Sequence, residues 1–266
     1  MKIILSRKGF DSSNGGQPNP ILPDGTLLSL PIPDPDGNNK YSNLRSNNES
    51  YYNIIHSLKP RTTLNAEDTC HLDPDLRKDV KDRLPGWKPA FGQSGSALTH
   101  LRNQGVTIGD LFLFFGWFKA TGEKDGKLKY KKGTRDQHII FGYMQIGSII
   151  EGKTNVPEWL KEHPHVGDRK VRDYKSNFIF LPSDSLSIMS GYKGCGVLDY
   201  RRDRVLTKDG KSRRFWDLPS FFKSIEISHH PNPWKDDCFV SAAIGQEFVM
   251  EANPDLIEWV KQIIKE

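Results

Sequence analysis

Two long apolar stretches in the middle of the chain constrain its fold more than any other feature. The first, VTIGDLFLFFGWFKA (Val106–Ala120), is a turn followed by an apolar run, and the second is HIIFGYMQIGSII (His138–Ile150). Apolar runs rich in aromatic and β-branched residues are typical of buried strands. Because a polar, basic loop connects the two runs, we expect an antiparallel pair of strands with a long tip.

Shorter segments predict the elements around this pair. Those that read as strands or extended pieces are Met1–Leu5, Thr26–Pro31, Lys175–Ser183, Phe221–Ser228 and Phe239–Glu251. Apolar spacing predicts a helix over Ser50–Leu58, and capping signals predict two more, one from Asp73 and Pro74 and one from Asn253 and Pro254. The predicted fold is α+β, a central, mostly antiparallel β-structure flanked by helices, in a single domain over residues 1–266.

Composition limits the class of protein. The chain has 266 residues, of which 36% are hydrophobic, and this is enough to bury a substantial core. No apolar run approaches the roughly 20 residues that cross a bilayer, and the start MKIILSRKGF is too short for a signal peptide. The cysteines, Cys70, Cys195 and Cys238, are isolated, which argues against disulfides or a zinc site built on cysteine pairs. We therefore expect a cytoplasmic protein without a membrane partner.

Positive charge is concentrated in two segments. Lys119–Arg135 and Arg201–Arg214 each contain seven Lys/Arg and two Asp/Glu, so together they carry +10, whereas the whole chain carries +5. Such clusters favour phosphate binding that depends on salt concentration. The competing interpretation is a pair of solvated loops whose lysines keep the protein soluble.

The opening loop SRKGFDSSNGGQPNP follows the first predicted strand and is dense in hydrogen-bonding groups. Arg7 and Lys8 are suited to hold phosphate and Asp11 to accept a proton, while Phe10 could either stack on a base or pack into the core. A loop pinned to a rigid strand is a common location for a site. The alternative is a surface loop in which Asp and Asn side chains cap their own turns.

Two further segments carry candidate chemistry. In TCHLDPDL, Asp73 and Asp75 are candidates for a catalytic base, a metal-binding pair or carboxylates that cap the start of a helix. Cys70 is a nucleophile only if a nearby cation or a helix N-terminus lowers its pKa. The GQSGS turn precedes an apparent helix beginning near Ala97, where exposed N–H groups suit an anion. A plain Ser-capped helix explains this turn equally well.

Histidine pairs occur in two polar loops. HPHVGD contains His163, His165 and Asp168, and SHHPNPW contains His229 and His230. Two histidines with a carboxylate are a conceivable metal site. Pairs of this kind in Pro-rich loops are usually polar surface, so we predict no metal site.

The residues also resemble two known families. GDLFLFFGWF and IIFGYMQIGSI resemble the central strands of PUA-like barrels, the group that includes ASCH and EVE domains. Across nearly the whole chain, SRKGFDSSNGGQPNPILPDG, CHLDPDL, PGWKPAFGQSGSALTHLRNQGV and GDLFLFFGWF in this order are similar to the third type of nucleotide modification associated domain. This resemblance implies a nucleotide or nucleic-acid partner and, in addition, partner proteins from a DNA-modification or defence system. It does not identify the reaction or a cofactor.

The leading hypothesis is a base- or nucleotide-modifying enzyme whose cleft is formed by the opening loop and the CHLDPDL and GQSGS turns. The residues expected in catalysis are Asp11, Cys70, His71 and Asp73. Those expected to bind substrate are Arg7, Lys8, Phe10, Ser12, Gln17, Gln93, Ser94, Ser96 and Trp117, and those expected to contact nucleic acid are Arg201, Arg202, Arg213 and Arg214. The alternative is a non-catalytic, PUA-like reader of modified bases, with an aromatic cage of Trp117, Phe118 or Tyr143.

Overall fold

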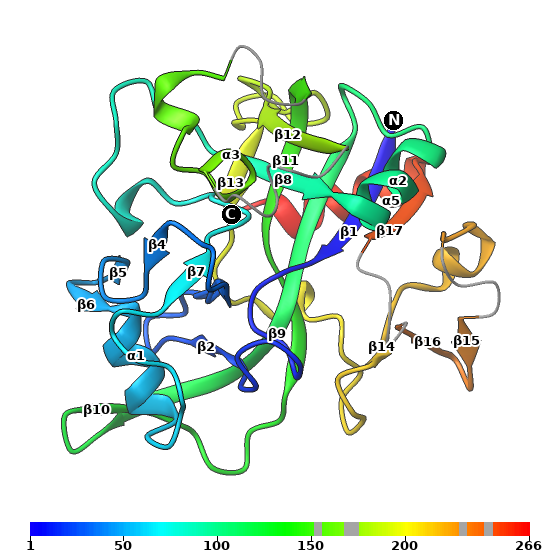
Figure 1. Ribbon diagram of the computed structural model, residues 1–266. Helices are drawn as coiled ribbons and strands as arrows, with labels where there is room; N and C mark the ends of the chain where they lie inside the picture. Colours follow the sequence, from blue (N-terminus) through cyan, green and yellow to red (C-terminus); the bar gives the residue numbers. More distant parts are fainter. Residues whose placement is uncertain (152–155, 168–175, 229–232, 242–246) are drawn as a thin grey trace.

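The computed structural model describes residues 1–151, 156–167, 176–228, 233–241 and 247–266. Its main sheet has the strand order β17-β1-β9-β11-β12-β8, with β2 and β10 added to β9 and β13 added to β11 (Figure 1). The strands of this sheet are β1 (Lys2–Arg7), β2 (Asn19–Ile21), β8 (Phe91–Ser94), β9 (Leu111–Lys124), β10 (Lys127–Tyr130), β11 (Gln137–Glu151), β12 (Asn177–Pro182), β13 (Cys195–Val197) and β17 (Glu247–Glu251).

Small sheets and short helices surround it. The remaining strands are β3 (Ile32–Pro33), β4 (Asn39–Lys40), β5 (Arg45–Ser46), β6 (Glu49–Ser50), β7 (Thr69–His71), β14 (Phe215–Trp216), β15 (Trp234–Lys235) and β16 (Cys238–Val240). The α-helices are α1 (Tyr51–Leu58), α2 (Gly95–Asn103), α3 (Pro164–Gly167) and α5 (Pro254–Ile264). Single 3₁₀ turns cover Lys78–Val80, Glu158–Leu160, Arg202–Arg204 and Ser220–Ser224. The fold is α+β, as predicted.

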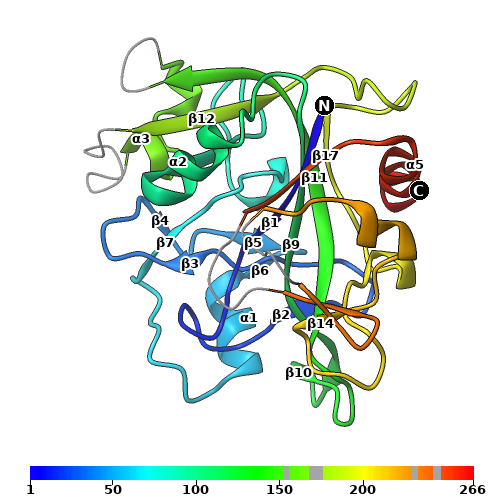
Figure 2. The same ribbon diagram turned by 90° about the vertical axis from the view of Figure 1, so that its right-hand side faces the viewer.

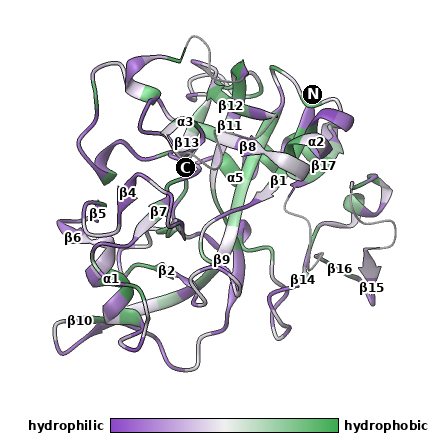
Figure 3. Ribbon diagram, in the orientation of Figure 1, coloured by the Kyte–Doolittle hydropathy of each residue, from purple (hydrophilic) through white to green (hydrophobic). Residues whose placement is uncertain are grey.

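The central strand pair forms as the sequence predicts. β9 and β11 are antiparallel, with Trp117 opposite His138 and Leu111 opposite Gln145. β1 lies along the other edge of β9 in parallel and pairs antiparallel with β17. Figure 3 shows that the hydrophobic residues are concentrated along these long strands, while the surrounding loops are hydrophilic.

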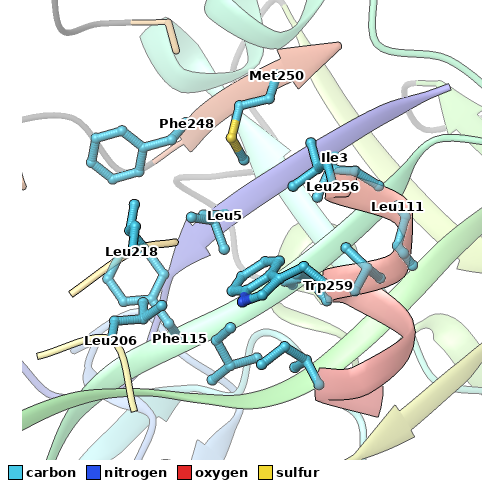
Figure 4. Close-up of a cluster of buried hydrophobic side chains, with 14 of the residues drawn as sticks. Ile3, Leu5, Leu111, Phe115, Leu206, Leu218, Phe248, Met250, Leu256 and Trp259 are labelled. Atoms are coloured by element: carbon cyan, nitrogen blue, oxygen red, sulfur yellow. The ribbon is translucent and has the colours of Figure 1, made fainter. Parts of the chain in front are cut away.

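Side chains from both faces of the sheet form two large cores. On one face, Ile3, Leu5 and Phe115 pack with Leu256 and Trp259 of α5 (Figure 4). On the other face, Phe91, Phe112 and Phe114 pack with Leu98 and Leu101 of α2. Figure 2 shows α5 on one side of the long strands and α2 and α3 on the other. The sheet is therefore covered on both faces, which explains why β9 and β11 read as continuous apolar runs.

The last helix, α5, is fixed at both ends. Asn253 Oδ1 accepts a hydrogen bond from Leu256 N at 2.8 Å, and Pro254 occupies the first turn, as predicted. At the other end, the buried Arg204 guanidinium donates to the carbonyls of Ile263 and Lys265, each at 2.9 Å. Arg201 also donates to the carbonyls of Gln262 and Lys265. These two arginines therefore satisfy carbonyls that the helix end leaves without partners.

Two local predictions are wrong. No helix opens at Asp73; only a single 3₁₀ turn, Lys78–Val80, follows it, because the Asp73 carboxylate is buried against distant residues instead of capping its own chain. Phe221–Ser228 contains most of the 3₁₀ turn Ser220–Ser224 rather than a strand. Thr26–Pro31, predicted as a short extended piece of the loop, contains no named strand and takes part in one isolated bridge within the described residues, between Leu27 and Ile21.

Candidate functional site

The opening loop lines a cavity of about 430 Å³ together with residues from β9, β11 and the second basic segment. We call it the Trp117 cavity. Its lining residues are Arg7, Phe10, Asp11, Ser12, Ser13, Trp117, His138, Ser212, Arg213, Arg214 and Ser241. Six residues predicted to bind substrate, to act in catalysis or to contact nucleic acid meet here: Arg7, Asp11, Ser12, Trp117, Arg213 and Arg214. Phe10 also lines the cavity, but it is almost completely buried.

Trp117 forms an aromatic wall of the cavity. The Arg213 guanidinium lies over its ring, 4.1 Å from the ring centroid, and Arg213 Nη2 donates to Ser12 Oγ at 2.5 Å. The indole Nε1 of Trp117 is buried and has no hydrogen-bond partner among the described residues. A buried donor without a partner is costly, so this group is suited to a ligand acceptor.

His138 is a cavity residue that the sequence did not indicate. It lies directly opposite Trp117 in the β9–β11 pair, so both side chains reach the same face. Trp216 Nε1 donates to His138 Nδ1 at 3.0 Å, so the proton of the neutral ring is on Nε2. Burial, together with the nearby Arg7 and Arg213, lowers the pKa of His138 to about 3. At neutral pH the ring is therefore uncharged and can donate from Nε2.

Positive charge surrounds the same cavity. Arg7 lies at the end of β1, and burial together with the nearby Arg213 lowers its pKa, against the opposing effect of Asp11. Arg214 is the third arginine in the lining. Three guanidinium groups around one aromatic wall favour an anionic, planar ligand.

Asp11 organises its own loop. Its Oδ1 accepts from the backbone N–H groups of Ser13 and Asn14, each at 2.7 Å, and from Asn14 Nδ2 at 3.2 Å. Gly15 has a φ of +81°, and a Cβ there would lie 2.4 Å from the Phe10 ring, so glycine is required. The Asp11 side chain therefore has the turn-capping role of the alternative interpretation, and its role as a proton acceptor stays a prediction.

Four predicted substrate-binding residues, Phe10, Gln17, Lys8 and Gln93, have buried side chains. Phe10 is 1% exposed and packs edge-on against Tyr41 in the core, with ring centroids 6.2 Å apart, so its ring is not available to stack on a base. Gln17 is buried beside Tyr130. Lys8 Nζ lies 3.1 Å from Glu247 Oε1, and Gln93 Nε2 donates to the same oxygen at 2.6 Å. Lys8 and Gln93 thus belong to a buried ionic cluster and are not available to a phosphate.

The GQSGS turn starts α2 but does not reach the cavity. Ser94 is the N-cap residue, and its side chain makes no capping hydrogen bond. Ser96 is exposed, and neither serine lines the Trp117 cavity. The prediction of a helix beginning here is confirmed, two residues earlier than expected, while a role in anion binding stays a prediction.

Cys70 does not meet the condition set for a nucleophile. It is 0% exposed on β7, and its Sγ donates to the Asn39 carbonyl at 3.2 Å. Burial raises the pKa of the thiol, with Asp34 adding to the effect. This is the opposite of the shift that would create a thiolate, so the catalytic prediction for Cys70 is corrected.

We expect Cys70 to resist alkylation in the folded protein. Iodoacetamide at pH 8 should label it at least tenfold more slowly than in urea, because the reactive thiolate is both buried and rare. Peptide mass spectrometry measures this for each cysteine separately. Rapid stoichiometric labelling of native Cys70 would restore it as a candidate nucleophile.

His71 and Asp73 meet two histidines from the HPHVGD segment. Asp73 Oδ1 lies 3.3 Å from His163 Nε2 and accepts from Gly92 N at 2.7 Å, and Asp73 Oδ2 lies 3.9 Å from His165 Nε2. Burial alone would raise the pKa of Asp73, but the hydrogen bond with His163 and the neighbouring histidines lower it to about 2. The prediction that these histidines are polar surface is wrong, since both are buried.

Among the described residues the carboxylate that the histidines meet is Asp73. The predicted Asp168 lies outside the described residues, as do His229 and His230. None of His71, Asp73, His163 and His165 lines the Trp117 cavity. The chain therefore has two separate groups of candidate residues. One is the Trp117 cavity, and the other is the histidine cluster, which we define as His71, Asp73, His163 and His165.

The two basic segments face each other across a second hollow. This basic groove has a volume of about 520 Å³, and its lining includes Lys131 and Arg135 from the first segment and Lys208 and Lys211 from the second. The next residues of the second segment, Ser212–Arg214, line the Trp117 cavity.

Arg201 and Arg202 line neither the Trp117 cavity nor the basic groove. Arg201 is engaged with Asp203 and the end of α5, and Arg202 pairs with Asp209 at 2.6 Å. The predicted nucleic-acid contact stays a prediction for both arginines. Among the described residues no helix is long and apolar enough to cross a membrane.

The fold and these hollows define an α+β protein with a cationic, aromatic cavity beside a basic groove. The chain belongs to the nucleotide modification associated domain 3 family, whose model matches residues 2–251. No curated protein and no solved structure gives a significant match. The family confirms the resemblance found in the sequence and indicates a role in nucleotide modification. The likeness to PUA-like barrels stays a prediction.

Proposed function

We propose that this protein is an enzyme that modifies a nucleobase, and that the base enters the Trp117 cavity. The observation that carries the proposal is the stack of Arg213 on Trp117 beside Arg7 and Ser12. Aromatic rings and guanidinium planes stack on bases, and arginines bind phosphate. The volume of about 430 Å³ falls within the range of small-molecule sites.

Each lining group has a task in this proposal. The base stacks on the Trp117 ring, displacing or joining the Arg213 guanidinium, while Arg7 and Arg214 hold the phosphate. His138 Nε2 donates a hydrogen bond to an acceptor on the base edge, while Trp117 Nε1, whose N–H lies in the plane of the indole ring, is available to a ligand acceptor beside the stack. Asp11 remains the candidate proton acceptor, because it is the one carboxylate in the lining among the described residues.

The basic groove supports a polynucleotide substrate rather than a free nucleotide. Four cations line it, and the segment that forms one of its walls continues directly into the cavity. A strand held in the groove would place one nucleotide at the cavity. A base in a duplex would first have to leave its stack.

Replacing Trp117 with leucine should weaken binding of a labelled single-stranded oligonucleotide by roughly 5- to 150-fold, because stacking contributes about 1–3 kcal/mol per base. Fluorescence anisotropy measures the affinity. The matched control is Trp87→Leu, since Arg83 lies 4.3 Å above the Trp87 ring but that pair is outside the cavity. Equal losses in the two variants, or none in Trp117→Leu, would contradict the proposed site.

A reader of modified bases is the second candidate, favoured by the engagement of Asp11 in its own loop. Mass spectrometry of nucleosides from total DNA and RNA of expressing cells separates the two. The enzyme should produce a new nucleoside that is absent with Trp117→Leu. A reader should bind the oligonucleotide and leave the nucleoside composition unchanged.

A further inference from the structure

We propose that His71, Asp73 and His165 form a binding site for one divalent transition-metal ion. Each offers one ligand atom, and these atoms all lie within 4.8 Å of one another. The three come from separate segments, β7, the loop after it, and α3. Two imidazoles and one carboxylate are a donor set that iron and zinc sites use. This inference does not depend on the Trp117 cavity.

The key contact is between His165 and Asp73. Asn177 Nδ2 donates to the His165 carbonyl at 2.7 Å, and this fixes the orientation of the Asn177 amide. Asn177 Oδ1 then accepts from His165 Nδ1, also at 2.7 Å. In the neutral ring, Nδ1 therefore carries the proton and Nε2 has an unprotonated lone pair.

That lone pair faces a carboxylate oxygen. His165 Nε2 and Asp73 Oδ2 are 3.9 Å apart, which is too long for a hydrogen bond. Two acceptors facing each other in a buried site repel each other unless a cation lies between them. Two neighbouring ligand atoms bound to one metal ion at about 2.1 Å lie roughly 3.0–3.4 Å apart, so the two side chains would move together by about half an ångström on binding.

The surrounding contacts are those of an outer coordination shell. His71 Nδ1 lies 3.3 Å from Asp34 Oδ2. In the same way, His165 Nδ1 donates to Asn177 Oδ1. Metal-binding histidines usually donate their second ring nitrogen to a carboxylate or carbonyl oxygen, which fixes the ring and increases its basicity. Asp73 Oδ1 is similarly held by Gly92 N at 2.7 Å. Each proposed ligand is thus oriented by a second residue.

His163 orients the carboxylate rather than binding the metal. His165 N donates to His163 Nδ1 at 3.3 Å, so in the neutral ring the proton of His163 is on Nε2. Nε2 lies 3.3 Å from Asp73 Oδ1, so its N–H interacts electrostatically with the carboxylate. His163 therefore acts on the metal through Asp73.

The fold also makes room for His165 at one specific position. A Cβ at Gly92 on β8 would lie 2.1 Å from His165 Cδ2. Only glycine allows the imidazole to lie against the strand while the Gly92 N–H reaches Asp73.

Metal content of the purified full-length chain tests the site. Inductively coupled plasma mass spectrometry should find one divalent metal ion per chain, and His71→Gln should reduce it at least roughly tenfold. His71 is the variant of choice because its side chain is the most exposed of the three, at 14%. The matched control is His56→Gln on α1, whose Nε2 bonds to the Leu64 carbonyl outside the cluster.

A second measurement uses the wild-type chain alone and so does not depend on the folding of a variant. After dialysis against EDTA, titration with Co²⁺ should give visible d–d absorption bands that saturate at one equivalent, and Zn²⁺ should raise the Tm. Folded chain that contains no metal and gives no Co²⁺ bands would overturn the proposal. So would equal metal content in His71→Gln and His56→Gln.

Discussion

Replacing Glu247 with glutamine is expected to lower the free energy of unfolding by about 3–5 kcal/mol. The Glu247 side chain is 1% exposed, and its Oε1 receives both Lys8 Nζ at 3.1 Å and Gln93 Nε2 at 2.6 Å. The variant leaves the Lys8 ammonium buried without a compensating charge, above the Phe91 ring. Urea unfolding followed by circular dichroism measures the change.

Two further variants separate this effect from a simple loss of contacts. The double variant Lys8→Met/Glu247→Gln removes both charges and should recover part of the loss, because no ion remains unpaired. The surface control is Glu67→Gln, whose pair with Lys40 is exposed and should contribute at most about 1 kcal/mol. If Glu247→Gln costs no more than Glu67→Gln, the ion pair is not the stabilising feature we infer.

Elements specified by local sequence were predicted well. β9 and β11 are long enough and apolar enough to be read without tertiary information, and Asn253 with Pro254 marks the start of α5 directly. Helix α1 was also predicted from its local sequence, and its N-cap residue Ser50 accepts a hydrogen bond at Oγ from Asn53 N at 3.1 Å.

Elements specified by contacts with distant residues were not predicted correctly. Asp73 has the sequence of an N-cap, but its partners His163 and His165 lie some 90 residues later, so their contact is invisible in a local pattern. Phe221 and Phe222 suggested a strand, whereas Phe222 packs edge-on against Trp259 of α5, with ring centroids 5.1 Å apart, from a 3₁₀ turn. In both cases a tertiary contact overrides the local preference.

The residues of the candidate site show the same difference between local sequence signals and contacts with distant residues. The loop residues Arg7, Asp11 and Ser12 were recognised from their composition, and the structure gathers them with Trp117 and Arg213. His138 could be found only from strand register, because its place in the cavity follows from lying opposite Trp117. Lys8 was misassigned because its partner Glu247 is at the other end of the chain.

His138 should make the protein unstable in acid. Its pKa is lowered to about 3 in the folded protein by burial and by Arg7 and Arg213, compared with about 6.5 in the unfolded chain. The unfolded state therefore takes up the proton first. The stability is fully present above about pH 6.5 and is lost as the pH falls toward 3.

Between pH 6.5 and pH 5 this linkage amounts to about 1.6 kcal/mol, because the unfolded imidazole is only half protonated at pH 6.5 and the full slope of 1.36 kcal/mol per pH unit is reached below it. Urea unfolding at both pH values should therefore show a loss in the wild type that exceeds the loss in His138→Gln by about this amount. Glutamine is chosen because its Oε1 can still accept from Trp216 Nε1, the hydrogen bond that holds the imidazole at 3.0 Å. Identical pH dependence in wild type and His138→Gln would mean that folding does not lower the pKa of His138, so that the burial and the arginine contacts assigned to it in the Trp117 cavity are wrong.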